Sequence, residues 1–243
     1  MKRESFGSRL GFILVSAGCA IGIGNVWKFP YICGAYGGAA FILIYLCFLV
    51  ILGIPVLVAE FAVGRGSHTS VAKCFDKLAP AGSGWKPLKF IGIIGCYMLM
   101  MFYTTVGGWM IYYCVKSLRG DFVGATPEAV TQSFSDMLGN APTMMLWMVI
   151  ICLIGFAVCF MGLQNGIEKI SKVMMSALLI IMVILAVHSV MMEGAGEGIS
   201  FYLIPDFQKI KEAGVGNVVF AALSQSFFTL SIGIGAMLIF GSY

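Results

Sequence analysis

Long apolar stretches alternate with short polar connectors along the whole of this 243-residue chain. Each stretch is long enough for a helix to cross the hydrocarbon core of a bilayer, which takes about 20 residues. Hydrophobic residues make up 60% of the chain and charged residues only 11%, a balance that a soluble domain of this length would not carry. The pattern predicts an all-α, polytopic membrane bundle with helices at 10–33, 39–63, 88–117, 143–161, 167–191 and 217–241.

The first apolar stretch is interrupted near its middle by glycines. Gly18, Gly22 and Gly24 each cost about 1 kcal/mol of helix propensity relative to alanine, and nothing in hydrocarbon offsets that loss. Backbone released from a helix is tolerated at membrane depth only where it is buried in protein or lines a cavity. Close packing of Gly18 and Gly22 against another helix is an alternative. Because it explains neither Gly24 nor the amide of Asn25, we expect a ligand site near the bilayer midplane.

The last apolar stretch, 216–243, has the same character. It places polar side chains and two glycines at mid-membrane: Ser224, Gln225, Ser226, Thr229, Ser231, Gly233 and Gly235. A single hydroxyl is more often bonded to its own helix than to a ligand, but here several converge with a glycine break. The two interrupted segments would each begin one half of an inverted repeat. Interrupted segments at such corresponding positions indicate the binding site of a secondary transporter.

The Lys and Arg residues of the connectors predict the orientation of the chain. With a cytoplasmic N-terminus, ten of them lie inside and five outside, which satisfies the positive-inside rule. The five outer residues are Lys28, Lys116, Arg119, Lys209 and Lys211. We therefore expect a multi-pass protein of the cell membrane with its N-terminus in the cytoplasm. The net charge of +4 then reflects this orientation, and we expect no nucleic-acid partner, because no Lys/Arg stripe is interleaved with aromatic residues.

The patterns of common catalytic and metal sites are missing from the sequence. The eight cysteines are scattered without a CxxC pair, which predicts unpaired thiols that behave as small buried hydrophobic residues. The chain has no Walker loop and no HExxH motif, and no nucleophile, base and orienting group are suggested together. We therefore expect a protein that is not an enzyme.

Four separate runs of the sequence carry a resemblance to a known family. They are RLGFILVSAGCAIGIGNVWKFPY (9–31), GGAAF (37–41), IPVLVAEFAVGR (54–65) and SQSFFTLSIGIGA (224–236). On these runs the chain resembles the neurotransmitter:sodium symporter family, whose members have about twice as many membrane helices. The resemblance implies a LeuT-type fold with discontinuous first and sixth helices. It also implies a single transmembrane domain, 1–243, made of a first repeat at about 9–192 and the truncated start of a second at 193–243.

The function implied by the resemblance is sodium-coupled symport of amino acids across the plasma membrane, with this chain as the N-terminal half. The alternative is a truncated membrane module that does not transport and packs with a partner chain. The implied partners are an amino acid, sodium ions, the bilayer, and either a complementary C-terminal half or a second copy of the chain; chloride coupling stays open. Gly22 favours an amino acid, because members that carry amines place an aspartate there to pair the ammonium group.

The resemblance also implies which residues bind sodium. At one site the ion is held by the carbonyl of Ala20, the side chain of Asn25 and Thr229. At a second site it is held by the carbonyls of Gly18 and Ile21, with further ligands on a later helix. Oxygen ligands of this kind suit a hard cation, and unwound carbonyls supply them without a fixed charge.

For the substrate, the resemblance implies that the carboxylate rests on the backbone amides of Ile23 and Gly24 and on the hydroxyl of Tyr103. The N-terminus of a half-helix stabilises such an anion through its free amides and its dipole. Phe228 would cover the substrate, although an aromatic residue in an apolar helix is more often a lipid or core contact. The side-chain pocket, for which ordinary helix packing is the alternative, would be lined by Leu99, Ser231 and Ile234.

Several positions concern the opening and closing of the site. Lys28 and Arg3 match the outer and inner gate arginines of the family, whose acidic partners would lie in the missing helices. Lys28 keeps the charge but loses the bidentate fork of arginine. Ser176 stands ten residues after Gly166, where many members have a proline that helps the fifth helix unwind, so inward release by unwinding is less well supported here. Glu60, inside the second stretch, should be paired or hydrogen-bonded.

Overall fold

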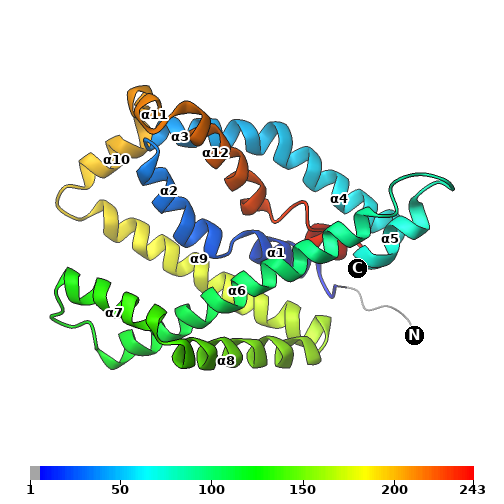
Figure 1. The fold of residues 1–243 in the computed structure, drawn as a ribbon, viewed down its shortest axis with the longest axis horizontal. Coiled ribbons are helices and arrows are strands. Elements are labelled where there is room, and N and C mark those ends of the chain that lie inside the picture. Colours follow the sequence, from blue (N-terminus) through cyan, green and yellow to red (C-terminus); the bar gives the residue numbers. More distant parts are fainter. Residues whose placement is uncertain (1–5) are drawn as a thin grey trace. The chain divides into compact units, whose positions relative to one another are not determined.

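The computed structural model describes residues 6–243, and every regular element in that range is a helix. Short π-helical segments, labelled η, are continuous with α-helices, so some long helices carry more than one label. The bounds are α1 (Arg9–Ala20), η1 (Gly24–Lys28), α2 (Phe29–Ala35), α3 (Ala39–Phe48), η2 (Leu49–Gly53), α4 (Ile54–Ser67), α5 (Val71–Leu78), α6 (Leu88–Arg119), α7 (Pro127–Gly139), α8 (Ala141–Phe160), η3 (Leu163–Glu168), α9 (Lys169–Val190), α10 (Ala195–Leu203), α11 (Phe207–Ala213), α12 (Val215–Leu230) and α13 (Ala236–Gly241) (Figure 1).

Four continuous helices in the described residues are long and apolar enough to cross a membrane: Ala39–Ser67, Leu88–Arg119, Ala141–Phe160 and Leu163–Val190. Two bent pairs complete the set. Arg9–Ala20 turns by 50° into Gly24–Ala35, and Phe207–Ala213 turns by 100° into Val215–Leu230. The predicted all-α membrane bundle with an interrupted first helix is therefore confirmed.

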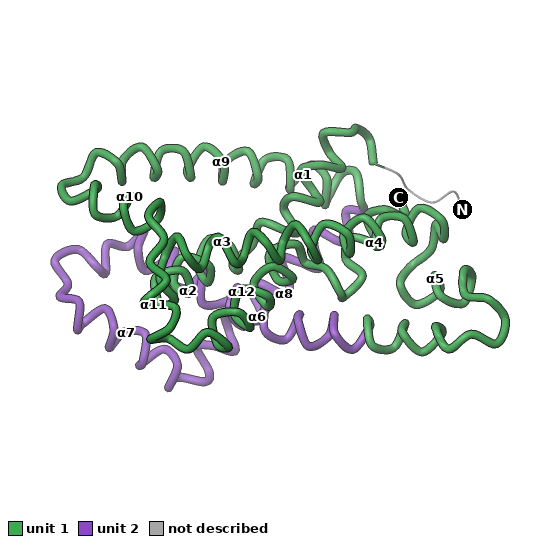
Figure 2. Tube along the Cα trace, turned by 90° about the horizontal axis from the view of Figure 1, so that it is seen from above, with its two compact units in different colours: residues 1–92, 163–243 green, residues 93–162 purple. Residues whose placement is uncertain are grey.

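The chain folds as two compact units (Figure 2). Unit 1 combines the described residues up to Gly92 with Leu163–Tyr243, and unit 2 is Ile93–Gly162. Both interrupted segments belong to unit 1, whereas Leu99 and Tyr103 of the expected site belong to unit 2. The predicted repeats, 9–192 and 193–243, concern internal symmetry rather than compactness, and they stay a prediction.

In unit 1, α12 packs along α3, α13 along α4, and α1 along α9 (Figure 1). A buried cluster lies where α2, α3, α11 and α12 meet, and it consists of Cys33, Ala40, Phe41, Tyr45, Ile210, Val218 and Ala222. Phe41 and Val218 are completely buried. Between membrane helices, close packing of this kind is stabilised by van der Waals contact rather than by transfer from water. This packing fixes α12 beside the first span, so the two interrupted helices meet.

Local backbone geometry shows where the interruptions occur. α1 ends where Ile21 leaves helical geometry (φ −90°, ψ 83°). α12 ends where Ser231 adopts the left-handed conformation (φ 51°), and Gly233 and Gly235 follow at φ 90° and 80°. Glycine enters this region without the steric penalty that other residues meet. The glycines that break the apolar pattern therefore coincide with real breaks in the last span, which was also expected to be discontinuous.

The fifth helix has no break at the position of the missing proline. α9 runs continuously from Lys169 to Val190 and includes Ser176. The irregular segment is η3, which precedes α9 and contains Gly166. Serine keeps the backbone N–H that proline lacks, so the helix can continue through this position.

Unit 2 contains most of α6 together with α7 and α8. Gly108 lets α6 approach the backbone of α8, because a Cβ at this position would lie 2.9 Å from the amide nitrogen of Met148. The rings of Trp109 and Phe134 pack edge to face with centroids 5.8 Å apart, which joins α6 to α7. Unit 2 thus has packing contacts of its own.

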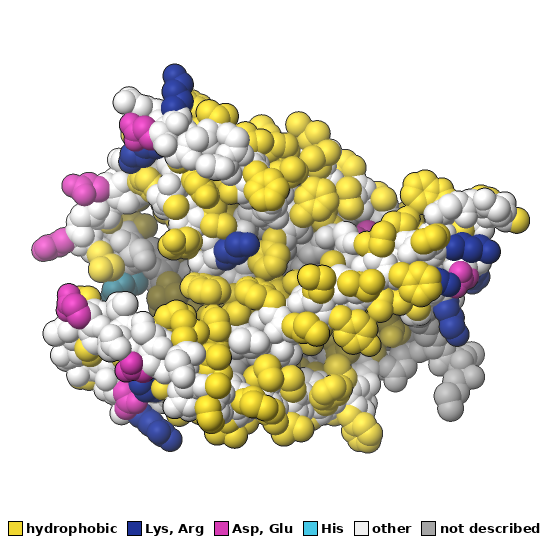
Figure 3. Space-filling model, viewed as in Figure 1, with side chains coloured by type: hydrophobic (Ala, Val, Ile, Leu, Met, Phe, Trp, Pro, Cys, Tyr) yellow, Lys and Arg dark blue, Asp and Glu magenta, His cyan; other side chains and the backbone are white. Residues whose placement is uncertain are grey.

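Apolar side chains cover most of the visible surface, and charged side chains lie mostly near helix ends (Figure 3). Phe160 at the end of α8 is 93% exposed, and none of the most apolar 18-residue window of this helix is buried inside the protein. Such a surface would be unfavourable in water but is the one expected of helices in contact with lipid.

The cysteines follow the same pattern. All eight are unpaired, but only Cys33 and Cys74 are buried, while Cys47, Cys114 and Cys159 are exposed. The prediction that the cysteines are buried was wrong for these exposed ones. A thiol behaves as a small hydrophobic group, so lipid can surround it as well as protein can.

Candidate ion and substrate site

Two hydrogen bonds join the interrupted spans of unit 1. The hydroxyl of Ser231 donates to the carbonyl of Cys19 at 2.8 Å. The side-chain nitrogen of Gln225 donates to the carbonyl of Gly24 at 3.1 Å. Residues more than 200 positions apart are therefore held together at the two breaks. Ser231, predicted to line the substrate pocket, bonds to the end of α1 in this structure.

Asn25 bridges the first break. Its Nδ2 donates to the carbonyl of Ala20 at 2.9 Å, across the residues where α1 stops. Its Oδ1 is buried and has no hydrogen-bond partner among the described residues. An unsatisfied buried acceptor costs about 1 to 3 kcal/mol, so this oxygen is suited to a bound cation. The structure thus brings together Ala20 and Asn25, two of the predicted sodium ligands.

The end of α1 supplies further carbonyls. The last four carbonyls of a helix have no helical partner, and Gly18 is among the last four of α1. Ile21, the other predicted ligand of the second site, follows directly and donates its own N–H to Ala17 at 2.6 Å. Gly18 faces α9, since a Cβ there would lie 3.1 Å from the sulfur of Met175.

Gln225 is a site residue that the sequence did not single out as a ligand. It is 1% exposed, its Oε1 is buried without a hydrogen-bond partner among the described residues, and its Nε2 lies 3.4 Å from the hydroxyl of Thr229. Gln225 precedes Thr229 by one helical turn and shares its face. Since Thr229 was a predicted ligand, that spacing could have identified Gln225.

Phe228 lies against the first break. A Cβ at Gly24 would overlap the Phe228 ring, and the ammonium of Lys28 lies 4.8 Å from the centre of that ring. A cation over an aromatic face is attracted by the ring quadrupole. Phe228, predicted to cover the substrate, and Lys28, the predicted outer-gate residue, are thus adjacent to each other beside Gly24.

Glu60 of α4 is bound to the second break. Its Oε1 accepts a hydrogen bond from the amide of Gly233 at 2.6 Å, as expected for a carboxylate inside a membrane span. Its Oε2 is buried without a hydrogen-bond partner among the described residues. Glu60 and Gly233 border a mostly apolar cavity of about 240 Å³, and Ile234, predicted for the substrate pocket, lines this cavity as well.

The remaining predicted site residues lie elsewhere. Leu99 and Tyr103 are one turn apart on the α6 portion of unit 2, so they share a helix face. Their part in the site stays a prediction. Arg3 lies outside the described residues. The described residues hold no group of three or more His, Cys, Asp or Glu side chains that could bind a metal ion.

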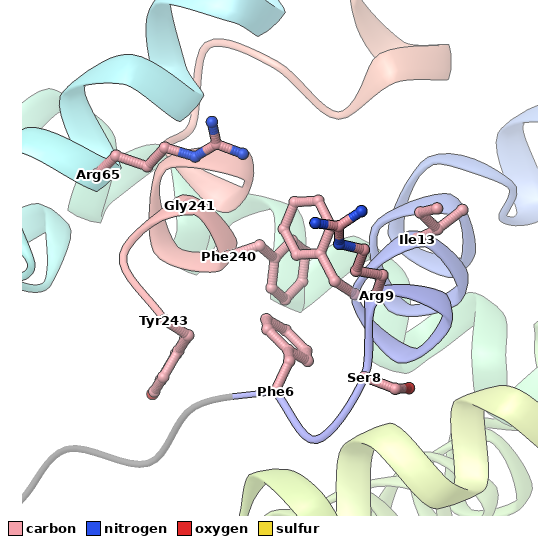
Figure 4. A pocket seen from close by; sticks show the side chains of 9 residues that line it. Phe6, Ser8, Arg9, Ile13, Arg65, Phe240, Gly241 and Tyr243 are labelled. Carbon is pink, nitrogen blue, oxygen red and sulfur yellow. The ribbon is translucent and has the colours of Figure 1, made fainter.

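A larger cavity of about 480 Å³ lies at the start of α1. Figure 4 shows the guanidinium groups of Arg9 and Arg65 at this cavity, with Phe6, Phe240 and Tyr243 around it. The aromatic rings pack edge to face, with 6.5 Å between the centroids of Phe6 and Phe240. None of the described lining residues is acidic, so the lining is complementary to an anionic group.

Known membrane transporters resemble this chain over its whole length. The chain is 36% identical over 242 residues to the uncharacterized sodium-dependent transporter YhdH of Bacillus subtilis. This alignment covers 100% of this chain and 52% of that protein. It is 28% identical over 282 residues to the sodium- and chloride-dependent taurine transporter of Homo sapiens, covering 100% of this chain and 44% of the relative. The chain thus spans about half the length of the curated relatives it matches. These relatives are transporters and not enzymes.

A solved structure matches over the whole chain. The crystal structure of MhsT in complex with L-phenylalanine aligns with a TM-score of 0.89 and 37% sequence identity, covering 100% of this chain and 54% of the MhsT chain. This match confirms the LeuT fold. The model of the sodium:neurotransmitter symporter family matches residues 3–133 and 128–243. The chain therefore belongs to the sodium:neurotransmitter symporter family of multi-pass, sodium-dependent membrane transporters.

Proposed function

We propose that this chain forms the N-terminal half of a sodium-coupled amino-acid symporter. The observation that carries the proposal is the buried Oδ1 of Asn25, which has no hydrogen-bond partner among the described residues and lies at the break between α1 and η1. A neutral amide oxygen beside helix-end carbonyls offers a hard cation several dipoles and no fixed charge. Sodium would bind there with Ala20, Asn25 and Thr229 at one site, and with Gly18 and Ile21 at the other.

The absence of a side chain at the first break supports an amino acid as the substrate. Gly22 has no side chain, so no carboxylate competes with a substrate carboxylate for the sodium ion. The amides of Ile23 and Gly24 open the segment Gly24–Ala35, and the positive end of a helix favours an anion. Tyr103 would donate to the same carboxylate, with Phe228 as the cover and Leu99, Ser231 and Ile234 beside the side chain. We propose an amino acid as the substrate.

The proposal is tested on the full-length transporter that contains this chain. Radiolabelled amino acids of each side-chain class are bound to the purified protein in sodium chloride, in potassium chloride and in sodium gluconate. We expect saturable binding of at least one amino acid in sodium and none in potassium. Equal binding in sodium and potassium would contradict the proposal, and the gluconate arm shows whether chloride is needed as well.

Orientation gives the first prediction, a cytoplasmic N-terminus. Lys172 lies 3.1 Å from the hydroxyl of Ser8, and Arg9 and Arg65 border one cavity, so these residues share a membrane face. In a background without the native cysteines, Gly84→Cys in the exposed α5–α6 loop should not react with an impermeant thiol reagent in intact cells, and should react after permeabilisation. Val123→Cys, 88% exposed in the α6–α7 loop, is the opposite control. The reverse labelling pattern would overturn the orientation.

A second prediction separates the symporter from the alternative, a truncated module. Residues 1–243 alone, reconstituted in vesicles, should show no sodium-gradient-driven amino-acid uptake above empty vesicles. The physical reason is that alternating access requires one helix bundle to move against another, and the second sodium site needs ligands from helices beyond this half. Co-reconstitution with the C-terminal half should restore uptake. Uptake by residues 1–243 alone would show that a second copy can replace that half.

A further inference from the structure

Unit 2 contains a polar cavity that belongs to neither of the two breaks. Its volume is about 360 Å³, and its lining comes from the last part of α6, from α7 and from the first turn of α8. All of these residues lie within Ile93–Gly162, so the cavity is internal to unit 2. A cavity of this size is large enough for a small ligand or for the headgroup of a larger one.

Two opposite charges border this cavity without pairing with each other. The ammonium of Lys116 donates to the hydroxyl of Ser133 at 2.8 Å and lies 5.4 Å from the centre of the Tyr112 ring. The carboxylate of Asp136 accepts a hydrogen bond from the Gln132 side chain at 2.8 Å. Neither charge forms an ion pair within the described part of the chain. An ammonium has three donors and a carboxylate about four acceptor sites, so both charges can bind a ligand as well.

The length of α8 places the cavity at the boundary between hydrocarbon and headgroups. α8 has 20 residues, so it is about 30 Å long, which equals the thickness of the hydrocarbon core. Thr143, in the first turn of α8, borders the cavity. Tyr112 borders it as well and packs edge to face with Trp147, with 6.0 Å between the ring centroids. Tyrosine and tryptophan are enriched at this depth of a membrane.

An exposed apolar stripe leads from the cavity along α8. Leu146 is one turn beyond Thr143, and Leu153 and Phe160 follow at intervals of seven residues, which places the three apolar side chains on one helix face. Leu146 is 59% exposed, Leu153 63% and Phe160 93%. The stripe runs from the first turn of α8 to its last residue, so it is long enough to follow an acyl chain through one leaflet.

We propose that this cavity binds the headgroup of a zwitterionic phospholipid with a primary ammonium group, a phosphatidylethanolamine. Lys116 binds the phosphate, Asp136 binds the ammonium, and an acyl chain lies along the stripe on α8. The interfacial depth and the apolar stripe favour a lipid over a soluble zwitterion. A choline headgroup has no N–H to donate to Asp136, and a glycerol headgroup has no cation, so the pair of charges selects among lipids with the same acyl chains.

The test measures lipid binding to the purified, delipidated full-length transporter by native mass spectrometry. Ethanolamine, choline and glycerol phospholipids with identical acyl chains are titrated separately. The ethanolamine lipid should bind at least fivefold more tightly than the other two. Asp136→Asn keeps an acceptor for Gln132 but removes the charge, and should bring the ethanolamine lipid to within twofold of the choline lipid. Lys116→Met should weaken both of these lipids at least fivefold, because they share the phosphate.

Two control variants separate the headgroup site from packing and from general attraction of charge. Ser133→Ala removes the 2.8 Å bond to Lys116 but keeps the ammonium, and Lys211→Met removes a cation from α11. Both should leave binding of the ethanolamine lipid within twofold. The proposal is overturned if either control weakens this lipid as much as Lys116→Met does, or if Asp136→Asn keeps the preference for it. Equal binding of the ethanolamine and choline lipids to the unmodified protein would also overturn it. So would competitive displacement of the lipid by a free amino acid, because the cavity would then take a soluble zwitterion.

Discussion

Asn25→Ala in the full-length transporter is expected to raise the sodium concentration for half-maximal substrate binding at least tenfold. The substitution removes the buried Oδ1 that has no partner among the described residues, together with the 2.9 Å bond that holds the Ala20 carbonyl. An interaction between a charge and a hydrogen-bonding group contributes about 1.5 to 3 kcal/mol, and 1.4 kcal/mol corresponds to a factor of ten. Amino-acid affinity at saturating sodium should change much less, because the ion is then bound in both proteins and its coupling to the substrate is largely restored.

The measurement is a sodium titration of amino-acid binding at fixed ionic strength. Asn217→Ala is the matched control, because Asn217 also donates its side-chain amide to a backbone carbonyl, that of Ala213 at 3.4 Å, but at an exposed position. It should leave the titration unchanged. If Asn25→Ala and Asn217→Ala give the same curve as the unmodified protein, Asn25 is not a sodium ligand.

Gly22→Asp is expected to shift the binding preference away from an amino acid and toward the amine formed from it by decarboxylation. The new carboxylate would stand at the first break, where a substrate carboxylate is proposed to complete the sodium shell. Two anions at close range in a site with little water repel strongly. Amino-acid affinity should fall at least tenfold, about 1.4 kcal/mol. The amine should lose much less or gain, since its ammonium acquires a partner.

Sodium-dependent binding of one amino acid and of its own amine, measured in both proteins, gives the comparison. Gly34→Asp introduces the same carboxylate in the other part of the bent span, where an added Cβ meets no atom within 4 Å. It should weaken both ligands little and equally. Equal losses for both ligands in Gly22→Asp would mean that Gly22 only allows close packing and that the proposed substrate class is wrong.

The sequence by itself determined the membrane helices and the position of the breaks. Apolar stretches of spanning length predict helices in a bilayer because a helix satisfies its own backbone there. The glycines between Gly18 and Gly24 and those at Gly233 and Gly235 marked both interruptions, since unfavourable helix formers at membrane depth need a structural reason. The contact between Ala20 and Asn25 is also local, spanning five residues. The family resemblance named these residues, and the structure brings the two side by side.

Only the tertiary structure decided which distant groups meet at the breaks. The bond from Gln225 to Gly24, the bond from Gly233 to Glu60 and the attachment of Gly7 to Glu168 join residues 201, 173 and 161 positions apart. No local period predicts such pairs, because each depends on how whole helices pack. Inside a membrane the partner of a buried carboxylate or amide is set by which backbone approaches it, and here glycines allow that approach. The attachment of Gly7 to Glu168 therefore follows from the fold, although both residues are visible in the sequence.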